Sequence, residues 1–108
     1  MYESKFKSDV NDELFRAVLS LENEEECYRF FEDLMTIKEL QSIAQRWQVA
    51  RMLDEKKTYG EIETATKASA ATISRVNKCL QYGAGGYTCV LKKFKEKEAG
   101  KKEAGNEK

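Results

Sequence analysis

The 108-residue sequence predicts an all-α protein, and three observations support that prediction. Proline is absent, and the residues that favour helices (Glu, Lys, Ala and Leu) are abundant. Apolar side chains return every three or four residues, as they do on one face of a helix. Several of these stretches begin with a residue able to cap a helix, followed three positions later by Glu.

Two amphipathic helices are expected in the first third of the chain. Ser8 can cap a helix over about residues 9–21, and Asn23 can cap a second over about 24–35. The acidic residues after Asn23 suit the positive end of a helix. The side chains expected to face inward are Val10, Leu14, Phe15, Val18, Leu21, Cys27, Phe30, Phe31 and Leu34.

The longest helix is expected over about residues 37–56. Thr36 and Glu39 have the spacing of a capping box at its start. Its apolar stripe consists of Ile37, Leu40, Ile43, Ala44, Trp47, Ala50 and Leu53. Trp47, in the middle of this stripe, is expected in the core or in a dimer interface. Because these three helices carry more apolar surface than a small motif can cover, we expect a homodimer.

Residues 58–81 predict a helix-turn-helix. Thr58 and Glu61 form another capping-box pattern, which starts a short helix at Tyr59. The apolar period then breaks, and Ser69 is suited to cap a second helix. The residues expected to face inward are Ile62, Ala65, Ile73, Val76 and Leu80.

The outer face of this second helix has the chemistry of a DNA-reading surface. It carries Ala71, Ser74, Arg75 and Lys78, and no carboxylate occurs from Ser69 to Gln81. Small residues allow close approach to base edges, hydroxyls can donate or accept there, and cations contact phosphates. The turn places Lys67 where glycine is usual, at a cost on the order of 1 kcal/mol.

A second interpretation of the same pattern is a protein–protein interaction module that does not read DNA. Paired short helices occur in many all-α proteins, and the formal net charge is zero. The charge is nevertheless divided. Residues 1–35 have 4 Lys or Arg against 10 Asp or Glu, residues 36–82 have 8 against 5, and residues 83–108 have 7 against 4. The positive charge therefore collects in and after the helix-turn-helix.

Composition argues against an enzyme. There are 3 Cys, no C-x-x-C pair and no His, so neither a zinc site nor a His-assisted nucleophile is expected. No phosphate-binding glycine loop is recognisable, and no cofactor is expected. No signal peptide and no long apolar run is visible, which predicts a cytoplasmic protein without membrane contact.

The C-terminal part is expected to be mostly irregular. Residues 83–86 are rich in glycine and predict a flexible joint, followed by a short helix ending near Phe94. Residues 96–108 contain no apolar side chain larger than Ala, so we expect a disordered charged tail. The folded domain would then comprise residues 1–95.

Two stretches of the chain resemble a known family. They are DLMTIKELQSIAQRWQVARMLDE and KKTYGEIETATKASAATISRVNKCL, and their most specific part is SAATISRVNKCL. Over about residues 8–94 the chain resembles the Trp repressor superfamily, and more narrowly its YerC/YecD type. The resemblance implies a Trp-repressor-like, intertwined homodimer that binds double-stranded operator DNA and regulates transcription, as a repressor.

The resemblance and the helix pattern together give the expected DNA contacts. Phosphate anchoring is expected from the two helix N-termini, at Tyr59 and Ser69, and from Lys67 and Lys78. Base readout is expected from Ala70, Ala71, Thr72 and Ser74. An arginine that reads guanine in the Trp repressor is replaced by Gly60, so a different operator sequence is expected.

The resemblance also implies a candidate effector pocket, formed by Thr36, Arg46, Arg75, Val76 and Cys79. Thr36, Arg46 and Arg75 match positions that contact tryptophan in the Trp repressor. Val76, however, stands where tryptophan binders have glycine, and Cys79 stands where they have a serine. A branched side chain would fill space that the indole needs. We therefore expect an unknown small-molecule effector, if any, rather than tryptophan.

Overall fold

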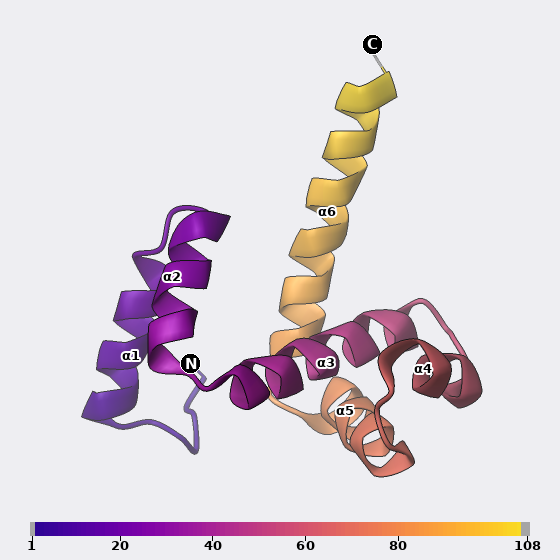
Figure 1. The fold of residues 1–108 in the computed structure, drawn as a ribbon, viewed down its shortest axis with the longest axis horizontal. Coiled ribbons are helices and arrows are strands. Elements are labelled where there is room, and N and C mark those ends of the chain that lie inside the picture. Colours follow the sequence, from indigo (N-terminus) through magenta and orange to yellow (C-terminus); the bar gives the residue numbers. More distant parts are fainter. Residues whose placement is uncertain (1, 107–108) are drawn as a thin grey trace. The chain divides into compact units, whose positions relative to one another are not determined.

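The computed structural model describes residues 2–106, with side chains up to residue 100. The described residues form six helices and no strand, as the sequence predicts (Figure 1). The helices are α1 (Asp9–Leu19), α2 (Glu24–Leu34), α3 (Ile37–Asp54), α4 (Tyr59–Thr66), α5 (Ala70–Tyr82) and α6 (Gly86–Asn106). The chain divides into two compact units, Met1–Ser42 and Ile43–Lys108.

Side-chain caps fix where five of the helices begin. The capping oxygens of Ser8, Asn23, Thr36, Thr58 and Ser69 each accept the backbone N–H three residues further on, at 2.9–3.2 Å. At α3 the box is reciprocal, because Glu39 Oε1 also accepts the N–H of Thr36 at 2.9 Å. Hydrogen bonds from the backbone and the hydroxyl of Thr36 hold the pKa of Glu39 below its usual value. The predicted helix starts are confirmed.

The helix ends follow the prediction less closely. The first three helices stop one or two residues earlier than expected, and α3 closes with Lys56 in the left-handed region at φ 65°. The larger correction concerns α6, which continues to Asn106 instead of ending near Phe94. Glu, Lys and Ala in this segment favour a helix even without packing. The division into a domain of residues 1–95 and a disordered tail of residues 96–108 stays a prediction, and residues 107–108 lie outside the described part.

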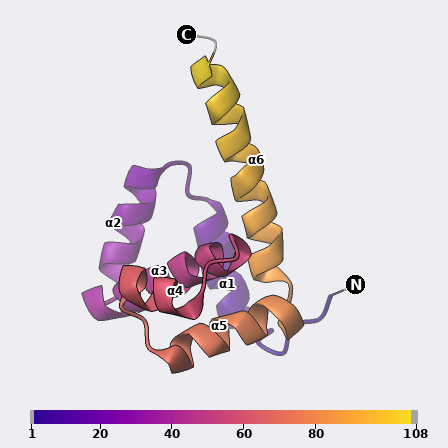
Figure 2. The same ribbon diagram turned by 90° about the vertical axis from the view of Figure 1, so that its right-hand side faces the viewer.

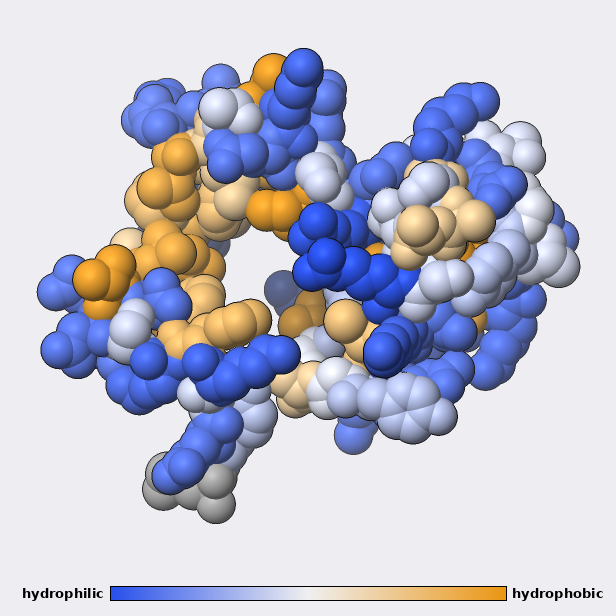
Figure 3. All heavy atoms as spheres, turned by 90° about the horizontal axis from the view of Figure 1, so that it is seen from below, coloured by the Kyte–Doolittle hydropathy of each residue, from blue (hydrophilic) through white to orange (hydrophobic). Residues whose placement is uncertain are grey.

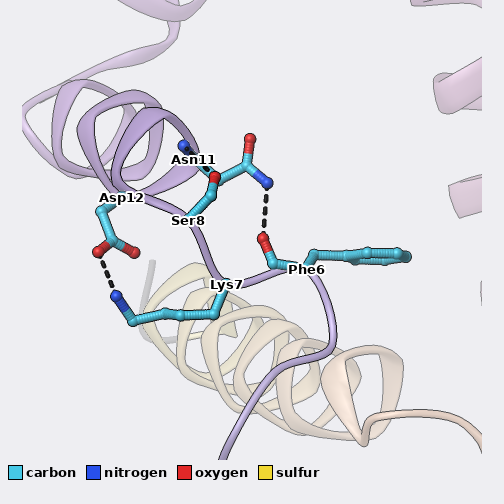
Figure 4. A network of polar contacts seen from close by, with 5 residues as sticks. All are labelled: Phe6, Lys7, Ser8, Asn11 and Asp12. Carbon is cyan, nitrogen blue, oxygen red and sulfur yellow. Dashed lines mark hydrogen bonds and ion pairs between the residues drawn. The ribbon is translucent and has the colours of Figure 1, made fainter.

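In the first unit, a set of polar contacts fixes the segment before α1 (Figure 4). Asn11 Nδ2 donates to the carbonyl oxygen of Phe6 at 2.7 Å, while the Asn11 N–H donates to Ser8. The ammonium of Lys7 pairs with the carboxylate of Asp12. The Phe6 ring stays exposed despite this anchoring.

The predicted inward faces of α1 and α2 are at most half-buried within their own unit. Both helices lie inside the described residues, and neither contains a buried residue. Hydrophobic residues gather on the surface of the part formed by these helices (Figure 3). The exposed ones include Val10, Leu14, Phe15, Leu19, Tyr28, Leu34 and Ile37. Two helices of 11 residues and the start of a third are too small to enclose these faces.

The second unit contains the core of the described chain. Its buried cluster consists of Val49, Ala50, Ile62, Ala68, Ile73 and Val76, with Trp47, Met52, Leu53 and Tyr87 packed against it. This cluster joins α3, α4 and α5 (Figures 1 and 2). The prediction that Ala65 faces inward is wrong, because Ala65 is exposed and Thr66 is buried in its place.

Aromatic contacts attach α6 to α3. The Trp47 ring stacks on Tyr87, with centroids 6.5 Å apart, and meets Phe94 edge-on at 5.9 Å. The Arg51 guanidinium lies 4.4 Å from the centroid of the Phe94 ring, and Lys95 Nζ lies 2.6 Å from Asp54 Oδ2. The half-buried position of Trp47 agrees with its predicted place in the stripe of α3.

Candidate nucleic-acid interface

The turn between α4 and α5 has a left-handed residue at its centre. Lys67 has φ 63° and ψ 13°, and its N–H donates to the carbonyl oxygen of Glu63 at 2.9 Å. The Lys67 side chain is exposed. Most non-glycine residues avoid this conformation, so the turn has the strain that the sequence predicted.

Thr66 connects the turn to α3 and α4 by hydrogen bonds. Its hydroxyl donates to the carbonyl oxygen of Ile62 at 2.8 Å and accepts the N–H of Ala68 at 3.1 Å. Its carbonyl oxygen accepts a hydrogen bond from Gln45 Nε2, on α3, at 3.0 Å. These bonds satisfy a buried polar side chain and fix the path of the chain into α5.

α5 has one buried face and one exposed face. Ile73 and Val76 are buried in the core, as the helical period predicts. Between Ser69 and Lys78 the exposed residues are Ser69, Ala70, Ala71, Ser74, Arg75 and Lys78, while Thr72 is half-buried. The exposed face therefore carries methyl groups, hydroxyls and cations.

The start of α5 is ordered by its own hydroxyls. Ser69 Oγ accepts the N–H of Thr72 at 3.2 Å and donates to Thr72 Oγ1 at 3.1 Å. The Thr72 oxygen accepts from Ser69, so its O–H proton can still donate outward. The methyl groups of Ala70 and Ala71 and the hydroxyl of Ser74 lie on the exposed face beside it.

Tyr59 lies at the start of α4, with 39% of its surface exposed. Its hydroxyl oxygen accepts a hydrogen bond from Asn77 Nδ2, on α5, at 3.4 Å. Asn77 Oδ1 in turn accepts from Gln81 Nε2 at 3.4 Å. Because the Tyr59 oxygen accepts from Asn77, its own O–H proton is free to donate to an external acceptor such as a phosphate.

The charge is one-sided from the end of α4 through α5, although α4 itself carries Glu61 and Glu63. No Asp or Glu occurs from Thr64 to Lys95, and the cations in this stretch are Lys67, Arg75, Lys78, Lys92, Lys93 and Lys95. The last of these is paired with Asp54, whereas Lys67, Arg75 and Lys78 belong to the turn and to the exposed face of α5. This arrangement favours a polyanionic partner.

The residues of the candidate effector pocket lie in both units. Thr36 belongs to the first unit, where its hydroxyl caps α3. In the second unit Arg46 is half-buried on α3, Arg75 and Cys79 are exposed on α5, and Val76 is only 2% exposed. Val76 therefore belongs to the packed core.

The Tyr87 hydroxyl lies within electrostatic reach of three of these residues. Burial raises the pKa of Tyr87 above its usual 10.0, and the neighbouring Cys79 adds to the rise. Arg46 and Arg75 act in the opposite direction, because their positive charges favour the phenolate. Tyr87, on α6, stacks on Trp47 of α3 and packs against the buried cluster that includes Ile73 and Val76 of α5.

Within residues 2–100, no group of three or more His, Cys, Asp or Glu side chains is placed to hold a metal ion. None of the helices in the described part combines the length and the apolar character needed to cross a bilayer.

Comparison with known proteins places the chain in a family. The family model described as Trp repressor protein matches residues 10–95, which include all of α1 to α5 except the first residue of α1. The chain belongs to the Trp repressor family. The resemblance inferred from the sequence is therefore confirmed, and so is the all-α, Trp-repressor-like fold.

Three relatives support this assignment. The uncharacterised protein YerC of Bacillus subtilis strain 168 is 55% identical over 98 residues, covering 91% of this chain and 94% of YerC. The crystal structure of a proposed Trp repressor from Staphylococcus aureus is similar with a TM-score of 0.81 and 50% identity, covering 84% of this chain and 91% of that one. A TrpR-like protein from Eubacterium eligens has a TM-score of 0.80 and 49% identity, with coverage of 83% and 93%.

Three residues of this region escaped the sequence analysis. Thr66 lies at a helix end, and the only available signal was its hydroxyl next to the break in the period. Asn77 lies on the flank of α5 next to Val76 and contacts Tyr59 across the motif. Tyr87 follows a glycine-rich joint, and its approach to α5 depends on how α6 packs, which no local pattern indicates.

Replacement of the strained turn residue should stabilise the protein. We expect Lys67→Gly to raise the free energy of unfolding by about 0.5–1 kcal/mol, because glycine adopts the left-handed conformation without steric cost. The matched control is Lys78→Gly, inside α5, which should lower it by about 1 kcal/mol. Urea unfolding monitored by Trp47 fluorescence measures both, and a loss of stability in Lys67→Gly would contradict the assigned turn geometry.

The raised pKa of Tyr87 predicts a loss of stability at alkaline pH. A group whose pKa is higher in the folded state contributes stability below its unfolded pKa, near 10.0, and loses it as the pH rises through the folded value. The free energy of unfolding of the wild type should therefore fall relative to that of Tyr87→Phe only above about pH 10. Urea unfolding at a series of pH values tests this, and parallel curves for the two proteins would refute it.

Proposed function

We propose that this protein is a sequence-specific DNA-binding transcriptional regulator that acts as a repressor in the cytoplasm. The observation that carries the proposal is that α5 has one buried face and one exposed face. One face is buried against α3 and α4, and the other presents small, hydroxyl-bearing and cationic side chains without a carboxylate. Such a helix can enter the major groove and approach base edges without repelling the phosphates.

Each exposed residue then has a proposed role on the duplex. Lys67 and Lys78 contact phosphates, together with the N-termini of α4 and α5 at Tyr59 and Ser69. The residues proposed to face the bases are Ala70, Ala71, Thr72 and Ser74. Arg75 is available to DNA or to an effector. Short side chains at these positions leave room for ordered water between α5 and the bases, and such bridging water can carry sequence specificity.

A homodimer is part of the proposal. The first unit buries none of its apolar side chains fully and leaves several exposed, among them Phe15 at 57%. A second copy of the chain, with the same unsatisfied faces, is the partner of matching chemistry. Two-fold symmetry would also present two α5 helices to successive major grooves of a palindromic operator.

Tryptophan is not proposed as the effector. Val76 is fully packed in the core, so the position that is glycine in tryptophan binders holds a branched side chain here. Cys79 also lacks the serine hydroxyl expected at its position. No catalytic role is proposed, because the site offers no paired acid and base or activated nucleophile among the residues of α4 and α5.

Loss of one phosphate contact should reduce the salt dependence of DNA binding. We expect Lys78→Ala to weaken binding to all duplexes alike and to reduce the slope of log affinity against log salt by about 0.9. Lys38→Ala, which removes an exposed lysine outside α4 and α5, should leave the slope unchanged. Fluorescence anisotropy of a labelled duplex over a range of salt concentrations measures the slope. A wild-type protein without measurable DNA affinity would instead favour the interaction module.

Disruption of the apolar face of α1 should dissociate the dimer. We expect Phe15→Asp to shift the protein to single chains, because a buried carboxylate in the interface costs several kcal/mol. Tyr82→Asp, at a position 80% exposed at the end of α5, serves as the control and should remain dimeric. Sedimentation equilibrium gives the mass of each. A monomeric wild type, or a Phe15→Asp variant with unchanged mass, would refute the proposed interface.

A further inference from the structure

Tyr87 joins three helices at one point. It is the second residue of α6, its ring stacks on Trp47 of α3 at an angle of 19°, and it packs against the buried cluster that includes Val76 of α5. Trp47 is held from another direction by Phe94, so the stacked pair has a fixed position. Tyr87 is therefore a tertiary contact and not a surface residue that happens to lie near α5.

The segment between α5 and α6 reverses the direction of the chain, so that Tyr87 returns to the side of α5. Gly83 lies so close to the preceding turn that an added Cβ would be 2.4 Å from the carbonyl oxygen of Cys79. Gly85 has φ 86°, a conformation that side chains disfavour. Both glycines permit a short reversal after Tyr82, which places the first turn of α6 beside α5.

Three of the five residues named for the candidate effector pocket act electrostatically on the Tyr87 hydroxyl. They are Arg46 on α3 and Arg75 and Cys79 on α5. The ring itself stacks on Trp47, the neighbour of Arg46 on α3. A fourth, Val76, belongs to the cluster on which the ring packs.

We infer that Tyr87 is the built-in occupant of the part of the candidate effector pocket that lies in the second unit, with Arg46, Arg75, Val76 and Cys79. Its ring packs against α3 and α5, where a bound aromatic effector would lie, and sets the orientation of α5 without a small molecule. A ring supplied by the chain loses no translational or rotational freedom on binding, so a free aromatic competitor is at a disadvantage. The inference deepens the proposed function and depends on it only for the effect on DNA binding.

The test is to remove the ring and return it as a free molecule. In Tyr87→Ala, added p-cresol, the side chain of tyrosine, should raise the thermal midpoint of unfolding by about 2 °C or more, because a ligand that binds only the folded state stabilises it. Indole is tested in the same way. The wild type, Tyr87→Phe and the control Tyr82→Ala should show no saturable rise. A response of Tyr87→Ala equal to that of Tyr82→Ala overturns the inference.

A second readout uses DNA. Without the ring, we expect only about a tenth of Tyr87→Ala molecules to hold α5 in the orientation that binds DNA. The apparent dissociation constant for DNA then rises about tenfold, and added p-cresol should return it to the wild-type value. Tyr87→Phe should bind as the wild type does. If the wild type binds no DNA, the proposed function fails, but the thermal measurement still decides the place of Tyr87.

A third measurement covers the case in which Tyr87→Ala does not fold. The thermal series is then run on Tyr87→Val, and the wild type is dialysed to equilibrium against radiolabelled tryptophan and, separately, indole. Absence of retained label in the wild type supports an occupied pocket. Retention of either compound by the wild type overturns the inference.

Discussion

Burial of the inner face of α5 is the interaction on which the candidate interface depends. Ile73 and Val76 pack with Val49 and Ala50 of α3 and with Ile62 of α4, and all of these side chains are at most 2% exposed. Removing such side chains from water is worth about 1.5–3 kcal/mol each, so this small cluster is a large part of what holds the unit together. Since a helix has a fixed period, the same contacts decide which residues of α5 face solvent. The chemistry of the exposed face is thus a consequence of core packing.

Local chemistry made much of this fold predictable. A capping oxygen and the N–H three residues ahead are neighbours in sequence, so the starts at Ser8, Asn23, Thr36, Thr58 and Ser69 required no tertiary information. Burial was predictable only where the partner elements belong to the same unit, as for Ile73. The inward faces assigned to α1 and α2 are only partly covered, because their unit is too small to enclose them. Half-buried are Val18, Leu21, Cys27, Phe30 and Phe31, whereas Val10, Leu14, Phe15 and Leu34 stay exposed. Ala65 was expected to face inward but is exposed, and its neighbour Thr66 is buried instead. A periodic pattern does not fix the inward position to within one residue at a helix end.

In the candidate site, too, residues placed by local patterns could be predicted, and residues placed by tertiary contacts could not. The exposed residues of α5 followed from the helical period, and the strain at Lys67 followed from its place in the turn. Thr66, Asn77 and Tyr87 were missed because each acts through a contact between different helices. Their contacts suggest why the motif holds its geometry with Lys67 in place of glycine. Thr66 ties the turn to α3, Asn77 ties α5 to α4, and Tyr87 ties α6 to both α3 and α5.

The central claim is that α5 reads DNA from a symmetric dimer, and selection of bound fragments from a random DNA pool tests it most directly. The purified protein is used with and without tryptophan, and the bound fragments are sequenced after several rounds. The account predicts enrichment of a two-fold symmetric motif with half-sites about one helical turn apart, equally strong in both conditions. Enrichment only with tryptophan would contradict the packed pocket around Val76 and Tyr87. Absence of any enriched motif would contradict sequence-specific binding and favour an interaction module on the same fold.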